Sequence, residues 1–183
     1  MAFRRGFKTD ANRIALKVRD HLGLRAVDPV DPAVVCRHFD IELVELSEIA
    51  RRSSKFRVRD CTFFSAATIR CDGRMAIIHN DTHHPDRQRS NICHELGHCF
   101  LGHTFAPPLT ENGERIRDGG IEAEANFFAG SLLIPNEAAV YIMRRGLTST
   151  ARQLYGVSQP MLIYRLRVSG AQKIHERVTK RAP

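Results

Sequence analysis

The chain has 183 residues, of which 43% are hydrophobic and 26% are charged, a composition typical of a folded globular protein with one domain or one domain plus a small appendage. The sequence has no run of about 18 apolar residues, so no transmembrane helix is predicted. Because the N-terminal segment also lacks the apolar stretch of a signal peptide, we expect a cytosolic protein.

The formal net charge of +8 is distributed unevenly along the chain. Residues 1–60 carry 13 basic and 9 acidic side chains, residues 61–140 carry 6 and 10, and residues 141–183 carry 9 and 1. A basic C-terminal region is compatible with nucleic acid, with an acidic partner, or with a solvated basic surface. The five cysteines are odd in number and none are spaced as Cys-x-x-Cys, so we expect reduced thiols rather than a cysteine-ligated metal.

The first half of the chain predicts two helices followed by a small sheet. Apolar periodicity and capping residues favour helices at 10–22 and 32–39, and alternation favours a strand at 41–46. The basic stretch 51–59 is predicted to be a loop or an exposed edge, with a further strand around 56–59. Strands on either side of Asp72-Gly73 form a predicted hairpin, because this dipeptide favours a tight turn. We expect these strands to make a small antiparallel sheet.

The second half of the chain is predicted to be mostly helical. A helix is expected from Arg87 to about Gly102, then a long loop to 120, and a buried helix that ends at Pro135. A further helix ending at Gly146 and a helix-turn-helix-like pair complete the chain. This pattern divides the chain into residues 1–135 and a basic helical region at residues 136–183.

The sequence "HELGH" in the predicted helix carries the most specific chemical signal. His94 and His98 are four residues apart and therefore lie on one helix face, where both imidazoles can bind one metal ion. Glu95 flanks this stripe, so its carboxylate can act as a base on a water molecule without being a ligand. Gly97 allows another segment to approach the helix closely, and we expect a strand or a substrate backbone there. The sequence therefore predicts a metal site with a catalytic glutamate.

A catalytic metal of this kind needs a third protein ligand, and three side chains qualify. His103 follows His98 too closely for the spacing H-E-x-x-H-x-x-G-x-x-H, and we expect it at the helix C-terminus instead. Glu122, across the loop, is the better candidate, with Glu124 as its competitor. Asn126 lies at i+4 from Glu122 and could serve as a hydrogen-bond partner for a ligand.

Four segments resemble the ImmA/IrrE family of metallo-endopeptidases and occur in the family's order. They are "GFKTDANRIALKVRDHLGL", "VDPAVVCRHFDIELVEL", "HNDTHHPDRQRSNICHELGHCFLGH" and "EAEANFFAGSLLIP". The last is the most specific, because the family carries Glu-x-x-Ala-Asn-x-Phe-Ala followed by Leu-Leu-Met-Pro. Here Ile134 replaces that methionine. The alignment implies Glu122, rather than Glu124, as the third ligand.

The resemblance also implies a fold, a cofactor and a function. The fold is an α+β zincin-like metallopeptidase core at residues 1–135, with the small antiparallel sheet packed on the H-E-x-x-H helix. The implied cofactor is Zn²⁺, bound by His94, His98 and Glu122, with Glu95 as the catalytic residue. The implied function is cleavage of a DNA-binding helix-turn-helix repressor, which derepresses its genes. An oxyanion donor is usual in such enzymes. The sequence offers five unranked suppliers, which are Tyr141, Tyr155, Tyr164, His83 and His84.

Two other functions compete with this one. The basic stretch "LYGVSQPMLIYRLRVSG" resembles a helix-turn-helix, which would make the chain a DNA-binding or repressor-binding regulatory protein. Two features count against a protein that reads DNA sequence. Arg152 stands where the first helix needs a small residue, and "MLIY" leaves few polar side chains to contact bases.

A cysteine hydrolase is the second alternative. Cys93 and Cys99 are each adjacent to a histidine in a helix. Because adjacent side chains in a helix diverge by about 100°, neither cysteine can form a catalytic pair with its neighbouring histidine.

Overall fold

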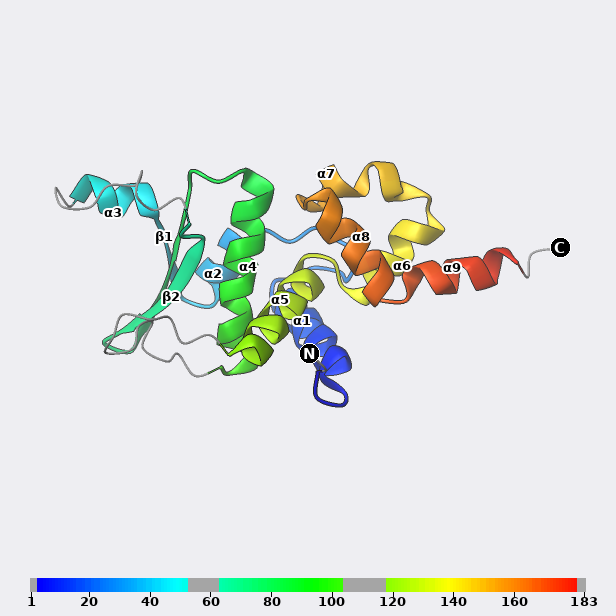
Figure 1. The fold of residues 1–183 in the computed structure, drawn as a ribbon, viewed down its shortest axis with the longest axis horizontal. Helices are drawn as coiled ribbons and strands as arrows, with labels where there is room; N and C mark the ends of the chain where they lie inside the picture. Colours follow the sequence, from blue (N-terminus) through cyan, green and yellow to red (C-terminus); the bar gives the residue numbers. More distant parts are fainter. Residues whose placement is uncertain (1–2, 53–62, 104–117, 181–183) are drawn as a thin grey trace.

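The computed structural model describes residues 3–52, 63–103 and 118–180. A small sheet lies at one end of the molecule, α4 (Pro85–Leu101) stands beside it, and α5 (Gly119–Leu133) packs against α4 (Figure 1). The helices that follow α5 gather at the opposite end (Figure 1). The predicted α+β class, with a small sheet next to the H-E-x-x-H helix, is confirmed.

The described part of the sheet has three strands in the order β1-β3-β2. They are β1 (Ile41–Glu45), β2 (Ala66–Cys71) and β3 (Arg74–His79). Strands β2 and β3 form the predicted hairpin, in which Asp72 and Gly73 both adopt positive φ, at 50° and 77°, as a type I′ turn requires.

One detail of the sheet differs from the prediction, because β1 runs parallel to β3 and the sheet is mixed. The hairpin reverses the chain between β2 and β3, and β1 pairs with the far side of β3 rather than with β2. Alternation of apolar residues indicates which side chains share a face but not the direction of a neighbouring strand. The strand expected around 56–59 lies outside the described residues.

The described residues of the N-terminal part include three helices: α1 (Phe7–His21), α2 (Pro32–His38) and α3 (Leu46–Arg52). Helix α1 starts before the predicted residue 10, because Gly6 at φ 83° begins the helix without a side-chain cap. Asp31 caps α2 as predicted, accepting a hydrogen bond from the Ala33 amide at 3.0 Å. Helix α3 was not predicted, and it includes residues 51–52 of the stretch expected to be a loop or edge.

The C-terminal part is entirely helical as far as the structure describes it. Its elements are α6 (Asn136–Arg144), the 3₁₀ turn η2 (Leu147–Ser149), α7 (Ala151–Tyr155), α8 (Gln159–Val168) and α9 (Ala171–Thr179). Helix α8 packs against α5, α6 and α7, and α9 packs against α6 and α8. Within the described ranges, no helix is long and apolar enough to span a membrane.

One hydrophobic core joins the sheet to the helices of both ends. Ile77 of β3, Leu96 of α4, Phe128 of α5, Ile142 of α6 and Leu162 of α8 are all 1% exposed or less and belong to it. Helix α4 therefore has a buried side against the sheet and α5, which fixes the direction of its remaining side chains.

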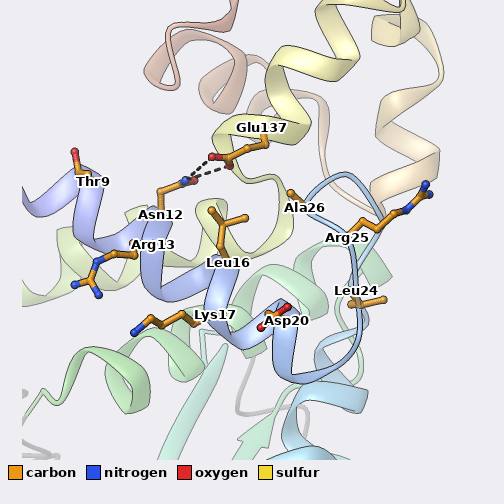
Figure 2. A pocket seen from close by; sticks show the side chains of 10 residues that line it. All are labelled: Thr9, Asn12, Arg13, Leu16, Lys17, Asp20, Leu24, Arg25, Ala26 and Glu137. Carbon is orange, nitrogen blue, oxygen red and sulfur yellow. Dashed lines mark hydrogen bonds between the residues drawn. The ribbon is translucent and has the colours of Figure 1, made fainter.

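Asn12 of α1 connects the N-terminal helix to the start of α6 (Figure 2). Its Oδ1 accepts a hydrogen bond from the Asn136 amide at 2.9 Å, and its Nδ2 donates to both carboxylate oxygens of Glu137, at 3.3 and 3.1 Å. A surface pocket of about 630 Å³ lies beside this contact. It is lined by Thr9, Asn12, Arg13, Leu16, Lys17, Asp20, Leu24, Arg25, Ala26 and Glu137.

Arg165 of α8 attaches the C-terminal helices to α5. The side chain is completely buried, its Nε donates to the Ile134 carbonyl at 2.9 Å, and its Nη2 donates to the Asn136 side chain at 3.0 Å. The guanidinium also lies over the Phe127 ring at 5.3 Å, and burial lowers the pKa of Arg165 to about 10. A buried charged donor of this kind holds two segments in one arrangement.

We expect Arg165→Met to lower the free energy of unfolding by about 1–3 kcal/mol, because the Ile134 carbonyl would lose its donor while remaining buried. Urea denaturation of the metal-free protein measures this loss. Arg167→Met is the matched control, since Arg167 lies on the same helix but is exposed, and we expect a change within about 0.5 kcal/mol. Equal midpoints for the two variants would contradict the role given to Arg165.

Candidate metal centre

Helix α4 carries the H-E-x-x-H residues, and capping residues define where it begins and ends. His84 accepts a hydrogen bond from the Asp86 amide at the start, and Pro85 follows at the first helical position. Gly102 ends the helix with φ 70°, a left-handed conformation in which glycine is not strained. Because Ile92, Cys93 and Leu96 are buried, the helix cannot rotate without exposing its apolar side.

His94 and His98 of α4 and Glu122 of α5 bring their ligand atoms together. The two Nε2 atoms lie 3.1 Å apart, the Glu122 Oε2 is 3.3 Å from His94 Nε2, and the Glu122 Oε1 is 3.7 Å from His98 Nε2. Among the described residues, these three form the one group of histidine, cysteine and acidic side chains close enough to share a metal ion. The structure therefore places Glu122, which is 24 residues after His98 in the sequence, beside both histidines.

The spacing and chemistry of this group fit a zinc ion. Nitrogen and oxygen ligands of tetrahedral zinc lie at ~2.0–2.2 Å, so neighbouring ligand atoms are about 3.3–3.5 Å apart. The distances of 3.1, 3.3 and 3.7 Å between the ligand atoms of His94, His98 and Glu122 bracket this value. Two imidazoles and one carboxylate also leave a fourth position for water or substrate, as catalytic zinc sites require.

Each histidine has a partner on its other ring nitrogen. The Nδ1 of His94 lies 2.9 Å from the Asn126 Oδ1, which accepts the proton on Nδ1 and leaves Nε2 with its lone pair. The Nδ1 of His98 lies 3.0 Å from the Nδ1 of His103. Burial, together with the neighbouring His94, lowers the pKa of His98 to about 4. The His98 imidazole is therefore neutral near pH 7, as a metal ligand must be.

Glu95 lies outside the ligand group and contacts the sheet. Its side chain accepts a hydrogen bond at 2.8 Å from the hydroxyl of Thr68, a residue of β2. Only 9% of Glu95 is exposed. Burial raises the pKa of the Glu95 carboxyl, and the Thr68 hydrogen bond and the adjacent His94 oppose part of the increase. Thr68 could not be predicted from the sequence, because its approach to Glu95 depends on the packing of β2 against α4.

Gly97 allows a close approach as predicted, but the segment that packs there is helix α5 and not the expected strand or substrate backbone. A Cβ atom at Gly97 would lie 3.0 Å from the carbonyl oxygen and 3.1 Å from the Cα of Ala125. Ala125 follows Glu122 by three residues and immediately precedes Asn126. The absence of a side chain at Gly97 therefore sets how closely the α5 residues approach His94 and His98.

The competing candidates for the third ligand lie next to this group but not in it. Glu124 contacts His103, with its Oε2 3.4 Å from the His103 Nε2. His103 follows the C-terminus of α4, as predicted, but its ring turns back toward His98. The contact between His103 and His98 could not be predicted from the sequence, because it depends on the turn at Gly102.

The cysteines of α4 have no features of a nucleophile. Cys93 is completely buried, and burial raises the pKa of its thiol. Burial also raises the pKa of Cys99 to about 11, and its thiol donates to the Met75 sulfur at 3.1 Å. Because thiolates rather than thiols are nucleophilic, neither residue supports a cysteine hydrolase.

Two of the five suggested oxyanion donors already form hydrogen bonds to the backbone. The Tyr155 hydroxyl donates to the Val27 carbonyl at 2.7 Å, and His84 caps α4. His83 lies beside Asn91, with 3.5 Å between its Nδ1 and the Asn91 Nδ2. Asn91 precedes His94 by three residues, so this contact places His83 about one helical turn from the metal centre.

An α+β fold in which an H-E-x-x-H helix and a glutamate from the next helix form a group that could hold a metal ion is consistent with a zincin-like metallopeptidase core. Residues 36–167 match the IrrE N-terminal-like domain of the M78 peptidases. The chain therefore belongs to this ImmA/IrrE family of metallopeptidases. A search of curated proteins found no match to the chain.

Proposed function

We propose that the chain is a zinc-dependent endopeptidase in which His94, His98 and Glu122 bind the metal and Glu95 is the catalytic residue. The convergence of two imidazole nitrogens and one carboxylate within 4.8 Å of one another supports this assignment. The same ligand types favour zinc over the oxygen-seeking cations Mg²⁺ and Ca²⁺. A peptidase acts on protein substrates, so the reaction is hydrolysis of a peptide bond.

The proposed mechanism divides the work between the metal and the side chains around it. Bound zinc supplies Lewis acidity at the scissile carbonyl and the attacking water. Glu95 accepts the proton of that water on its carboxylate and then delivers the proton to the leaving amine nitrogen. Thr68 donates to one oxygen of Glu95 and keeps the carboxylate oriented. Asn126 holds His94 with Nε2 free for the metal.

We propose that the substrate is a DNA-binding helix-turn-helix repressor whose cleavage derepresses its genes. Membership of the ImmA/IrrE family supports this substrate class. The charge distribution supports it as well, since residues 141–183 carry 9 basic and 1 acidic side chains and could bind an acidic protein surface. On this proposal, residues 1–135 form the peptidase core and residues 136–183 assist substrate binding in the cytoplasm.

DNA binding by the C-terminal helices is the alternative, and the α7–α8 pair favours it. Gly156 forms a left-handed turn after α7, and Ser158 caps α8. However, Arg165 of α8 is buried and approaches Gly130 of α5, so that face of α8 is not free. The exposed residues of α8 are Gln159, Pro160, Ile163 and Arg167, so only two polar side chains of this helix are available to contact the donors and acceptors of base edges.

The proposed metal site predicts that Glu122→Ala weakens zinc binding by more than about 100-fold, because a ligand is lost rather than a partner of a ligand. Competition of the metal-free protein against a chromophoric chelator measures this affinity. Glu176→Ala is the matched control, since Glu176 is an exposed glutamate on α9. Equal affinities for the two variants would contradict the assignment of Glu122.

The substrate proposal is tested by co-expressing the chain with a helix-turn-helix repressor encoded next to it. We expect a shortened repressor with the native chain and an intact repressor with Glu122→Ala. An intact repressor in both cases, together with salt-dependent binding of the native chain to DNA, would favour the alternative function.

A further inference from the structure

Outside the three ligands, His103 and Glu124 form a connected pair that ends at His98. The Nδ1 of His103 is 3.0 Å from the Nδ1 of His98, and the Nε2 of His103 is 3.4 Å from the Glu124 Oε2. The His103 side chain is 8% exposed and that of Glu124 is 24% exposed. The two imidazole rings meet edge to face, with centroids 5.1 Å apart.

The turn after α4 creates this arrangement. Gly102 adopts φ 70°, and the His103 amide donates to the His98 carbonyl at 3.0 Å, which reverses the chain direction. The reversal brings the His103 ring back against the ring of the residue that accepts its backbone hydrogen bond. Glu124, from α5, then meets the other nitrogen of His103.

One arrangement of protons satisfies every nitrogen in this chain of contacts. If Nε2 of His98 is free for a metal, its Nδ1 carries the proton and donates to Nδ1 of His103. His103 must then carry its own proton on Nε2, which donates to the Glu124 carboxylate. The charge of Glu124 thereby favours the tautomer of His98 that presents a lone pair to the metal.

We propose that His103 and Glu124 are positioning residues for His98, so that a Glu124–His103–His98 relay orients this ligand and increases its affinity for the metal. The proposal rests on the assignment of His98 as a ligand in the proposed function. It gives the two histidine ligands separate supports. Asn126 holds His94, and the His103–Glu124 pair holds His98.

The test measures zinc affinity of the metal-free protein by competition with a chromophoric chelator. We expect His103→Phe to weaken zinc binding by about 10–100-fold, because the phenyl ring keeps the edge-to-face contact but accepts no proton from His98. His103→Gln should recover part of this loss, since its amide oxygen can accept from Nδ1. Glu124→Gln should also weaken binding, because His103 loses the charged acceptor. The visible spectrum of the cobalt-substituted protein should change in His103→Phe.

The matched control is His38→Phe, because His38 also makes an edge-to-face contact, with Phe39 at 5.0 Å, but is exposed. Native zinc affinity and a native cobalt spectrum in a folded His103→Phe variant would overturn the relay. If His103→Phe does not fold, native affinity in both His103→Gln and Glu124→Gln overturns it. A different result, in which His98→Ala binds zinc as tightly as the native chain, would refute the proposed metal site itself.

Discussion

Replacing Glu95 with glutamine should lower peptidase activity by about 10²–10⁴-fold while zinc binding stays close to native. The amide keeps the size of the side chain and can still accept the hydrogen bond from Thr68, but it cannot take a proton from water at neutral pH. Because Glu95 lies outside the group formed by His94, His98 and Glu122, its loss removes no ligand. Cleavage of the co-expressed repressor, followed on gels over time, measures the activity.

The control for this variant must separate loss of the base from damage to the fold. Glu48→Gln makes the same chemical change on α3, where Glu48 is partly exposed and pairs with Arg52 at 2.7 Å. We expect native activity in this control and native melting temperatures in both variants. Full activity in Glu95→Gln would show that another group acts as the base, whereas loss of zinc would show that Glu95 supports the ligands.

The residues on one helix could be predicted from the sequence because helical geometry alone relates them. The i, i+4 spacing of His94 and His98 determined that their imidazoles share a face, and the structure brings their Nε2 atoms within 3.1 Å. The same spacing predicted that Asn126 would face the same way as Glu122, and Asn126 contacts His94. For Glu122, spacing left Glu124 as a competitor, and only the family resemblance separated them.

Contacts that depend on tertiary packing could not be predicted from the sequence. Thr68 reaches Glu95 because β2 packs on α4, and a threonine in a strand is otherwise unremarkable. His103 was predicted to lie at the end of α4, but its contact with His98 depends on the dihedral angles of Gly102. The parallel direction of β1 was similarly hidden, because both directions give the same alternation of side chains along a strand.

The contacts of Glu122 and Asn126 with the histidines of α4 depend on the distance between α4 and α5, which the backbone at Gly97 controls. Gly97→Val should therefore lower the free energy of unfolding by about 3 kcal/mol, since a Cβ there would lie 3.0 Å from the Ala125 carbonyl oxygen and a branched side chain adds further overlap. The obstructing atoms belong to the backbone of α5, so the helices must separate to accommodate them. This cost exceeds the roughly 0.3–0.5 kcal/mol of helix propensity that replacing a helical glycine with valine returns.

Separation of the two helices should also weaken zinc binding, because Ala125 lies between Glu122 and Asn126, which contact His94. Urea denaturation and the chelator competition measure the two effects in the same protein. Gly120→Val is the matched control, since a Cβ at this helical glycine would approach only the Asp118 side chain, at 3.1 Å, and displacing this N-cap of α5 costs only about 1 kcal/mol. If Gly97→Val kept both native stability and native zinc affinity, close packing of α4 on α5 would not be what sets the geometry of the metal site.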